Sequence, residues 1–275
     1  MNQSLKERAI SILRAARLLP AYNHLKYYWV AAAHGPANRA FRAEHPDFPV
    51  PPLPLAYDAY GHVGLADYRE SGRRHAAFLA DLLRRHAPGW NPLRVLEWGC
   101  GPARVIRHLP ALLPPGSEFL GTDYNPTTIA WCRKAIPNMR FEENKLEPPL
   151  PFGPAFFDVV YCLSVFTHLS EEMHYAWRDE LLRVLKPGGL LILTAHGDFY
   201  RERHLFPHER AGYDAGKLVV RGRVEEGKKW FAAFHSPAFM RERFLKGTEI
   251  VEHITRPIHG SIEQDVWVVK KPSGA

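Results

Sequence analysis

The hydrophobic and polar positions of this chain follow two periods, and their order along the sequence predicts an α/β sheet. Short apolar runs bounded by proline, glycine or acidic residues indicate buried strands, and apolar residues three or four positions apart indicate helices. The expected strands cover residues 93–97, 118–122, 139–143, 156–164, 190–194, 248–255 and 264–270. The helices expected between them cover residues 103–113, 126–136 and 171–185. Strands that alternate with helices predict a mostly parallel sheet with helices on both faces.

The first 88 residues follow a different pattern, typical of helices and a proline-rich connection. Residues 2–18 predict a basic amphipathic helix, and a second helix rich in tyrosine ends near Gly35-Pro36. Prolines crowd residues 44–56 and predict an irregular strap. A further helix is expected over residues 70–86, with Pro88-Gly89 as its stop signal. We therefore expect a helical cap with a strap over residues 1–88, followed by the main domain over residues 89–275. The first helix is interpreted as packing on that domain, with an anionic membrane surface as the alternative.

Composition and charge narrow the class of protein. The chain has 275 residues and 46% apolar residues, which suits one α/β domain of about 200 residues with additions, or two domains. The net charge is +7, but no run of lysine and arginine exceeds two residues, so a solvated basic surface is favoured over a nucleic-acid site. The three cysteines form neither a metal spacing nor an even-numbered disulfide framework, which indicates a reducing compartment. Without a signal peptide or a long apolar run, a cytoplasmic protein with no membrane span is expected. The oligomeric state stays open.

The most informative stretch is Leu93 to Arg104, where an apolar run leads to Glu97, Gly99 and Gly101. Glycines without a Cβ let the backbone approach a ligand closely. About twenty residues later Asp123 follows the second expected strand, and its carboxylate could accept hydrogen bonds from both hydroxyls of a ribose. The alternative for Asp123 is a turn of the Asx type before the next helix.

Three segments in this order resemble the class I S-adenosylmethionine (SAM) dependent methyltransferases. Glu97, Gly99 and Gly101 match the family's first motif, with Ala103 at its third glycine position, and "FDVVYCLSVFTHL" and "LLRVLKPGGLLILT" match its fourth strand, helix and fifth strand. The resemblance covers residues 93–195. It implies a Rossmann-like seven-stranded sheet with an antiparallel edge hairpin and SAM as the cofactor, S-adenosylhomocysteine being the product. The passages "FHSPAFMRERF" and "QDVWVVKKP" are similar to a bacterial subgroup linked to glycan or natural-product modification.

The resemblance also implies roles for individual residues. Glu97 and the glycine loop would hold the methionine end of SAM, Asp123 its ribose and Asn144 its adenine. The implied cofactor-binding set is Glu97, Gly99, Cys100, Gly101, Asp123, Tyr124, Asn144, Lys145, Leu146, Cys162 and Ser164. By analogy, Tyr60 or Tyr68 could also touch the cofactor. Residues 197–247 are expected to hold the substrate-recognition insertion.

The expected reaction is methyl transfer to a small molecule or a glycan, at a hydroxyl. A base would help to remove the hydroxyl proton, and His168 is the first candidate, with His196 the second. Methylation of a nitrogen and a non-catalytic SAM-binding protein remain alternatives.

Other chemistries fit the sequence less well. The dinucleotide pattern G-x-G-x-x-G is broken, because Arg104 stands at its last position. The Asn/Asp-Pro-Pro-aromatic motif of enzymes that methylate DNA amino groups does not follow the fourth strand. His204 and His208 lie four apart, but Pro207 between them opposes a ligand-bearing helix, so no metal site is expected.

Overall fold

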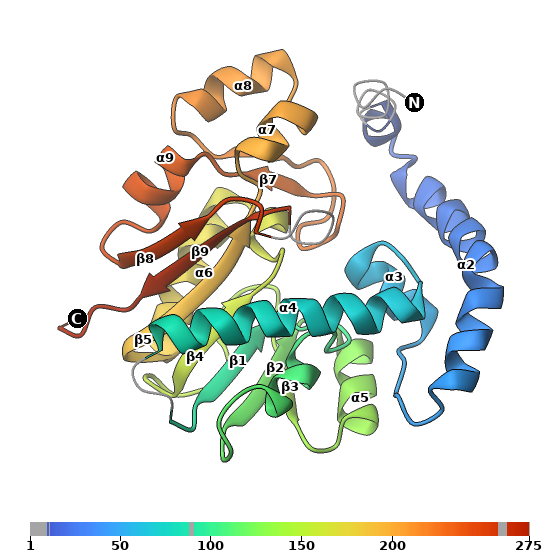
Figure 1. Cartoon of the computed structure of the whole chain (residues 1–275). Coiled ribbons are helices and arrows are strands. Elements are labelled where there is room, and N and C mark those ends of the chain that lie inside the picture. The colour runs from blue at the N-terminus through green and yellow to red at the C-terminus, as the bar shows by residue number, and fades with distance from the viewer. Residues whose placement is uncertain (1–9, 11, 88–90, 258–262, 275) are drawn as a thin grey trace.

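A seven-stranded sheet forms the centre of the molecule (Figure 1). The computed structural model describes residues 10, 12–87, 91–257 and 263–274. The strand order is β3-β2-β1-β4-β5-β9-β8. The strands are β1 (Arg94–Trp98), β2 (Glu118–Asp123), β3 (Arg140–Glu143), β4 (Phe157–Cys162), β5 (Leu185–Ala195), β8 (Glu249–Ile254) and β9 (Asp265–Lys270). β1 to β5 pair in parallel, whereas β9 runs antiparallel to both β5 and β8. The Rossmann-like sheet with an antiparallel edge hairpin is confirmed.

The order of the strands reverses next to β1. From β1 the chain moves outward to β2 and β3, and then returns to β4 on the other side of β1. Connections on the two sides of this point leave the sheet in opposite directions, which opens a crevice at the carboxyl ends of β1 and β4. The topology therefore fixes where a ligand can enter.

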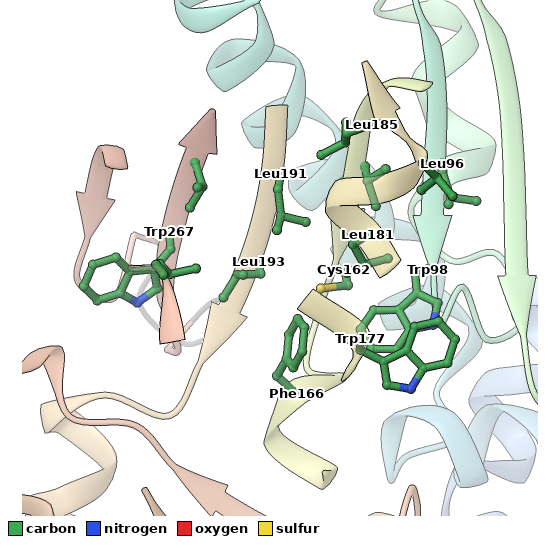
Figure 2. Packing of buried hydrophobic residues seen from close by; sticks show 14 of the residues in the cluster. Leu96, Trp98, Cys162, Phe166, Trp177, Leu181, Leu185, Leu191, Leu193 and Trp267 are labelled. Atoms are coloured by element: carbon green, nitrogen blue, oxygen red, sulfur yellow. The ribbon is translucent and has the colours of Figure 1, made fainter. Parts of the chain in front are cut away.

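Helices cover both faces of the sheet. Successive residues of each strand point alternately to the two faces and so into two separate hydrophobic cores. One face meets α4 (Leu65–His86), η1 (Ile106–Ala111) and α5 (Pro126–Ala135), and Val95, Val159 and Ile192 point to it. The other meets α6 (Glu171–Val184), α9 (Pro237–Phe239) and η3 (Met240–Phe244). This second core includes Leu96, Cys162, Leu191 and Leu193, and within it the rings of Trp98 and Trp177 lie against each other (Figure 2).

The amino-terminal helices differ from the prediction. α2 (Leu19–Glu44) continues through Pro36 instead of ending there. A proline inside a helix removes one N–H bond, here the one to the carbonyl of the exposed residue Ala32. The second half of α2 is anchored independently, because Asn38 donates to the carbonyl of Val63 and accepts from the N–H of Leu65, both at 2.9 Å. Of the expected helix over 2–18, residues 12–15 are helical, and residues 1–9 and 11 lie outside the described part.

The proline-rich strap is shorter than predicted. α3 (Leu53–Tyr60) begins inside it, because Pro54 sits in the first helical turn, where its missing N–H costs nothing. α4 starts at Leu65 rather than at residue 70 and packs against the sheet. The predicted stop signal Pro88-Gly89 lies outside the described residues. The division of the chain at 88/89 stays a prediction.

The segment after β1 is the largest local departure. The prediction was a helix over 103–113, but the chain makes turns as far as Val105 and then the short 3₁₀ helix η1. Ala103 has a positive φ of 53°, which interrupts a right-handed helix, and Pro110 cannot donate a helical hydrogen bond. The chain therefore stays irregular beside the cavity.

Two predictions around β5 are refined. The Lys-Pro-Gly-Gly sequence lies between the helix expected over 171–185 and the strand expected over 190–194, but it belongs to the start of β5. A register shift between Phe157 and Val159 accommodates it. Residues 197–247 contain regular elements: α7 (Asp198–His204), α8 (Pro207–Asp214) and the hairpin of β6 (Val219–Arg221) and β7 (Ala232–Phe234) before α9. The role of this insertion in substrate recognition stays a prediction.

Candidate active site

A cavity of about 730 Å³ opens at the carboxyl ends of β1, β2 and β4. This volume lies in the range that holds a small-molecule ligand. Ten residues of the predicted cofactor set line it: Glu97, Gly99, Cys100, Gly101, Asp123, Tyr124, Asn144, Lys145, Leu146 and Ser164. The candidate base His168 lines it as well. The sheet topology thus brings together side chains spread over some seventy positions of the chain.

The glycine loop after β1 is held by the end of β2. The N–H groups of Gly99 and Cys100 donate to the carbonyl of Thr122 at 2.8 and 2.9 Å. Gly99 has a φ of 72°, and a Cβ placed on it would lie 2.4 Å from Cγ2 of Val165. Only glycine fits this conformation and this close approach, so the loop surface faces the cavity as bare backbone.

Glu97 places a carboxyl at the base of the cavity. Its side chain is buried, and Oε2 accepts a hydrogen bond from the N–H of Ile106 at 3.1 Å. Burial raises the pKa of Glu97 to about 8, although the Ile106 N–H works in the opposite direction. At neutral pH this carboxyl is therefore largely protonated and can donate a hydrogen bond as well as accept one.

Asp123 ends β2 and makes two backbone contacts. Oδ2 accepts from the N–H of Gly101 and Oδ1 from the N–H of Asn125, both at 2.9 Å. Burial raises the pKa of Asp123, while these two N–H groups lower it. The contact to Asn125 is the Asx-type turn considered above. Because a carboxylate has about four acceptor positions, the turn leaves capacity for a ligand, and the two interpretations are compatible.

Asn144 follows β3 and presents an unsatisfied acceptor. Its N–H donates to the carbonyl of Asp123 at 3.1 Å, and Nδ2 donates to the carbonyl of Lys145 at 2.6 Å. Oδ1 is buried without a hydrogen-bond partner among the described residues. A buried acceptor without a donor is costly, so this atom marks a place where a ligand donor would be stabilised.

The amino-terminal helices supply a wall that sequence reasoning largely missed. Arg104 donates to Oγ of Ser71 at 3.0 Å and lies 3.2 Å from Nδ1 of His75, both on α4. Its guanidinium stacks 4.9 Å from the ring centre of Tyr60, which ends α3. All four side chains line the cavity, and the Tyr60 hydroxyl is buried without a partner in the described part of the chain. Nothing in the spacing of these residues links them.

The structure separates the two tyrosines that were considered together. Tyr60 faces the cavity, whereas the hydroxyl of Tyr68 donates to the carbonyl of Pro102 at 2.5 Å and Tyr68 does not line the cavity. Tyr68 therefore fixes the glycine-loop segment from behind.

A hydrogen-bonded polar group closes the other end of the cavity. The N–H of Ser164 donates to Oγ1 of Thr194 at 2.7 Å, Thr194 donates to Oε1 of Gln264 at 2.6 Å, and Gln264 donates to Oγ of Ser164 at 2.5 Å. These residues come from the ends of β4, β5 and β9, and all three line the cavity. Ser164 has a positive φ of 65°, an uncommon conformation that costs about 1–2 kcal/mol. Only Ser164 was predicted.

The two candidate bases occupy different places. Nδ1 of His168 lies 2.7 Å from the carbonyl of Phe231. A carbonyl can only accept, so Nδ1 carries the proton in this bond and Nε2 is the basic nitrogen. Burial lowers the pKa of His168, which keeps the ring neutral at neutral pH. His168 lines the cavity.

His196 and Cys162 are not brought to the cavity lining. Nδ1 of His196 bonds to the carbonyl of Ala233 at 3.0 Å, and its ring stacks on Tyr200 at 4.0 Å. The Cys162 thiol points into the second hydrophobic core (Figure 2), because alternate residues of a strand face opposite sides. Among the described residues, no group of three or more His, Cys, Asp or Glu side chains is arranged to hold a metal ion.

The connection between β6 and β7 covers one side of the cavity. The N–H of Gly227 donates to the carbonyl of His168 at 2.9 Å, and the Tyr124 hydroxyl donates to the carbonyl of Gly227 at 3.3 Å. Nζ of Lys229 donates to the carbonyl of Tyr57 at 3.3 Å and lies 3.6 Å from the centre of its ring. Burial lowers the pKa of Lys229 to about 8. This connection therefore joins α3 to the loop that carries His168.

Comparisons with known proteins agree with this geometry. Residues 95–189 match the methyltransferase domain family. The chain is 31% identical over 156 residues to a trans-aconitate 2-methyltransferase of Methylobacterium nodulans, covering 57% of this chain and 56% of that protein. It is 31% identical over 118 residues to a malonyl-[acyl-carrier protein] O-methyltransferase of Legionella pneumophila, covering 40% and 39% of the two chains. The chain thus spans little more than half the length of the first of these relatives.

A solved structure has the same fold. The crystal structure of a SAM-dependent methyltransferase from Methanosarcina mazei superposes with a TM-score of 0.52 at 18% identity, covering 70% of this chain and 97% of that one. The sheet order, the glycine loop beside an acidic strand end and the matched family domain lead to one assignment. Residues 95–189 therefore form a methyltransferase domain within a class I, Rossmann-like fold.

Proposed function

We propose that this protein transfers a methyl group from SAM to the hydroxyl of a small-molecule acceptor, a glycan being one such acceptor. The observation that carries the proposal is the meeting of the glycine loop, Asp123 and Asn144 in one cavity. A nucleoside that carries an amino-acid tail can be bound by backbone groups, a carboxylate and an amide, and this cavity presents all three.

The residues around the cavity fit this ligand. Asn144 Oδ1 and the Tyr60 hydroxyl are buried polar atoms without partners among the described residues, and SAM carries polar groups that could bond to both. A Cβ on Gly101 would lie 3.2 Å from the Tyr60 hydroxyl, so the loop keeps space that a side chain would fill. These features support the proposal that the cavity binds a ligand and is not merely a packing void.

We assign parts of SAM to particular residues. Asp123 would accept hydrogen bonds from the ribose hydroxyls, and Asn144 Oδ1 would accept from the adenine amino group. Glu97 and the bare loop at Gly99 would hold the methionine end. The guanidinium of Arg104, held by Ser71 and His75 in the cavity lining, would pair with the methionine carboxylate.

Bound SAM supplies an electrophilic methyl carbon on a sulfonium sulfur. The chain's own task is to orient the acceptor and to receive its proton. Nε2 of the neutral His168 can accept a hydroxyl proton, since Nδ1 stays bonded to Phe231. The hydrogen-bonded group of Ser164, Thr194 and Gln264 can orient polar groups of the acceptor.

The relatives support an oxygen acceptor on a small molecule. One is named for trans-aconitate and the other is a malonyl-[acyl-carrier protein] O-methyltransferase. For this chain we propose the class of acceptor, an oxygen of a small molecule, and not a particular compound.

Calorimetry tests the first part of the proposal. We expect SAM and S-adenosylhomocysteine to bind and NAD not to bind. Transfer of a labelled methyl group to panels of hydroxyl, carboxyl and amine compounds then tests the second part. Label on an amine would replace the hydroxyl proposal with N-methylation. Binding without turnover on any panel would favour a non-catalytic SAM-binding protein, and no binding of either adenosyl ligand would overturn the proposal.

A further inference from the structure

The outward face of α2 carries an apolar stripe. Leu25, Tyr28 and Trp29 are 71%, 58% and 73% exposed, and Leu18, just before the helix, is 52% exposed. The spacing of three and four places Leu18, Ala21, Leu25, Tyr28 and Ala32 on one side of the helix, with Trp29 beside them. We call these six residues the outer stripe. The opposite side of α2 is the one that packs on the domain, through Val30 and Phe41.

This arrangement is unusual for a surface helix. Such a helix normally has one apolar face toward the core and a polar face toward water. α2 has apolar residues on both of these faces, and none of the described residues covers its outward face. A single exposed leucine would mean little, but a continuous stripe with tryptophan and tyrosine is typical of an interaction surface.

The charge around the stripe has one sign. Residues 10–43 contain Arg14, Arg17, Lys26, Arg39 and Arg42 and no aspartate or glutamate. Arg17 and Arg39 lie beyond the two ends of the outer stripe and are exposed. A partner surface with negative charge therefore complements this helix. A second copy of the chain does not, because pairing two such helices would bring their cations together without carboxylates.

We propose that the outer stripe docks on an anionic lipid surface. Leucine, tyrosine and tryptophan would enter the headgroup region, where amphipathic aromatic rings are favoured. The arginines at both ends would meet lipid phosphates and add electrostatic attraction to the apolar contact. Docking would be peripheral, since no helix in the described part of the chain is long and apolar enough to cross a membrane.

α2 and the helical residues just before it also contact one wall of the cavity. Arg14 donates to the carbonyl of Trp230 at 2.8 Å, and the rings of Tyr22 and Trp230 meet edge to face at 6.0 Å. The neighbouring Lys229 lines the cavity. Figure 1 shows α2 along one margin of the molecule, next to α3. A lipid surface against the outer stripe would thus lie next to the element that supports this wall. The docking inference stands without the proposed methyl transfer.

Co-sedimentation of the full chain with vesicles tests the inference. One set of vesicles contains phosphatidylcholine alone and the other also contains phosphatidylglycerol. We expect binding to the anionic vesicles, weaker binding at high salt and little binding to the neutral ones. The double variant Leu25→Ser/Trp29→Ser should partition at least about tenfold less, because it removes two large apolar groups from the contact. Arg17→Gln/Arg39→Gln should weaken binding to the anionic vesicles only.

Matched controls separate docking from folding. Val220→Ser removes an exposed apolar residue of β6 that is not part of the outer stripe, and should sediment like the unmodified protein. Thermal unfolding and S-adenosylhomocysteine affinity should be the same in all variants. The inference is overturned if the unmodified chain binds neither vesicle or if the Leu25→Ser/Trp29→Ser variant binds equally well. A dimer in ultracentrifugation that this variant loses, without vesicle binding, would assign the outer stripe to a second copy instead.

Discussion

The two walls of the cavity are built in different ways. On the sheet side, Gly99 and Asn144 follow directly after strands and Asp123 ends one, and hydrogen bonds with the backbone fix their positions. On the helical side, Tyr60 and Lys229 come from α3 and from the β6–β7 connection, and side-chain contacts hold them. The sheet wall therefore has little freedom, whereas side-chain contacts on the other wall can adjust. We expect substitutions in the sheet wall and its adjoining loops to have the larger effects.

The largest effect is expected at His168, on the loop after β4. His168→Ala should lower turnover on the order of a hundredfold, with SAM affinity changed by less than about twofold. His168→Gln is the matched variant, because its amide can still donate to Phe231 but cannot act as a base. Turnover near that of the unmodified enzyme in either variant would remove His168 from the mechanism.

The pH profile of the same residue is a separate prediction. Burial lowers the pKa of His168 below its ordinary value of 6.5, and only the neutral ring can accept a proton. The rate of the unmodified enzyme should therefore be constant just above pH 6.5 and fall as the pH drops through the lowered pKa. Initial rates across this range should show the fall, and His168→Gln should lack it. If both proteins show the same fall in rate at low pH, the fall is due to the titration of another group.

Gly99 tests how rigid the sheet wall is. Gly99→Ala should reduce the free energy of unfolding by about 3 kcal/mol, because it adds a left-handed backbone penalty to a clash with Val165. Gly61→Ala is the matched control, since Gly61 has the same φ of 72° but open space around its Cβ. It should cost only about 1–2 kcal/mol. Equal losses in urea titrations would show that the loop can relax away from Val165.

Asp123→Ala should weaken SAM binding by more than about tenfold, or about 1.4 kcal/mol. This substitution removes the Gly101 N–H contact together with the proposed ribose contacts. Calorimetry with S-adenosylhomocysteine measures the change, and Asp58→Ala, at another carboxylate of the lining, is the control. Unchanged affinity in Asp123→Ala would refute the ribose assignment.

The smallest effect is expected on the helical wall. Lys229→Met should change S-adenosylhomocysteine affinity by no more than about threefold, because a single cation over a ring contributes about 0.5–1 kcal/mol. Lys217→Met, an exposed lysine on the surface, provides the comparison. A loss as large as that of Asp123→Ala would show that the two walls are equally important and would end the distinction drawn here.

The same contrast explains what the sequence could predict. The strands, the mostly parallel sheet with its edge hairpin and the residues at the strand ends could be inferred, because each depends on a local pattern and on a topology with few alternatives. The contact of Arg104 with Ser71 and His75 could not, because it joins α4 to the glycine loop through tertiary packing. Gln264 was placed in an expected strand, but its bonds to Ser164 and Thr194 depend on β9 lying next to β5.

Two local errors have a common cause. Pro36 was interpreted as the end of a helix that continues, and residues 103–113 as a helix that does not form. In the first case, Asn38 anchors the helix beyond the proline. In the second, the backbone at Ala103 turns against helical geometry. Tertiary contacts outweighed local propensity at both positions, as they often do where propensities are weak.

The position of β9 between β5 and β8 has a consequence for synthesis on the ribosome. Ala195 of β5 pairs with Asp265 of β9, seventy residues further along the chain. At about 5–20 residues per second, translation of that interval takes roughly 4–14 s. During this time the edge of β5 opposite β4 lacks its native partner strand. β8 is made before β9 but does not take that place, because its native partner in the sheet is β9. An exposed apolar strand edge invites aggregation, so the nascent chain passes through its most vulnerable period before β9 emerges.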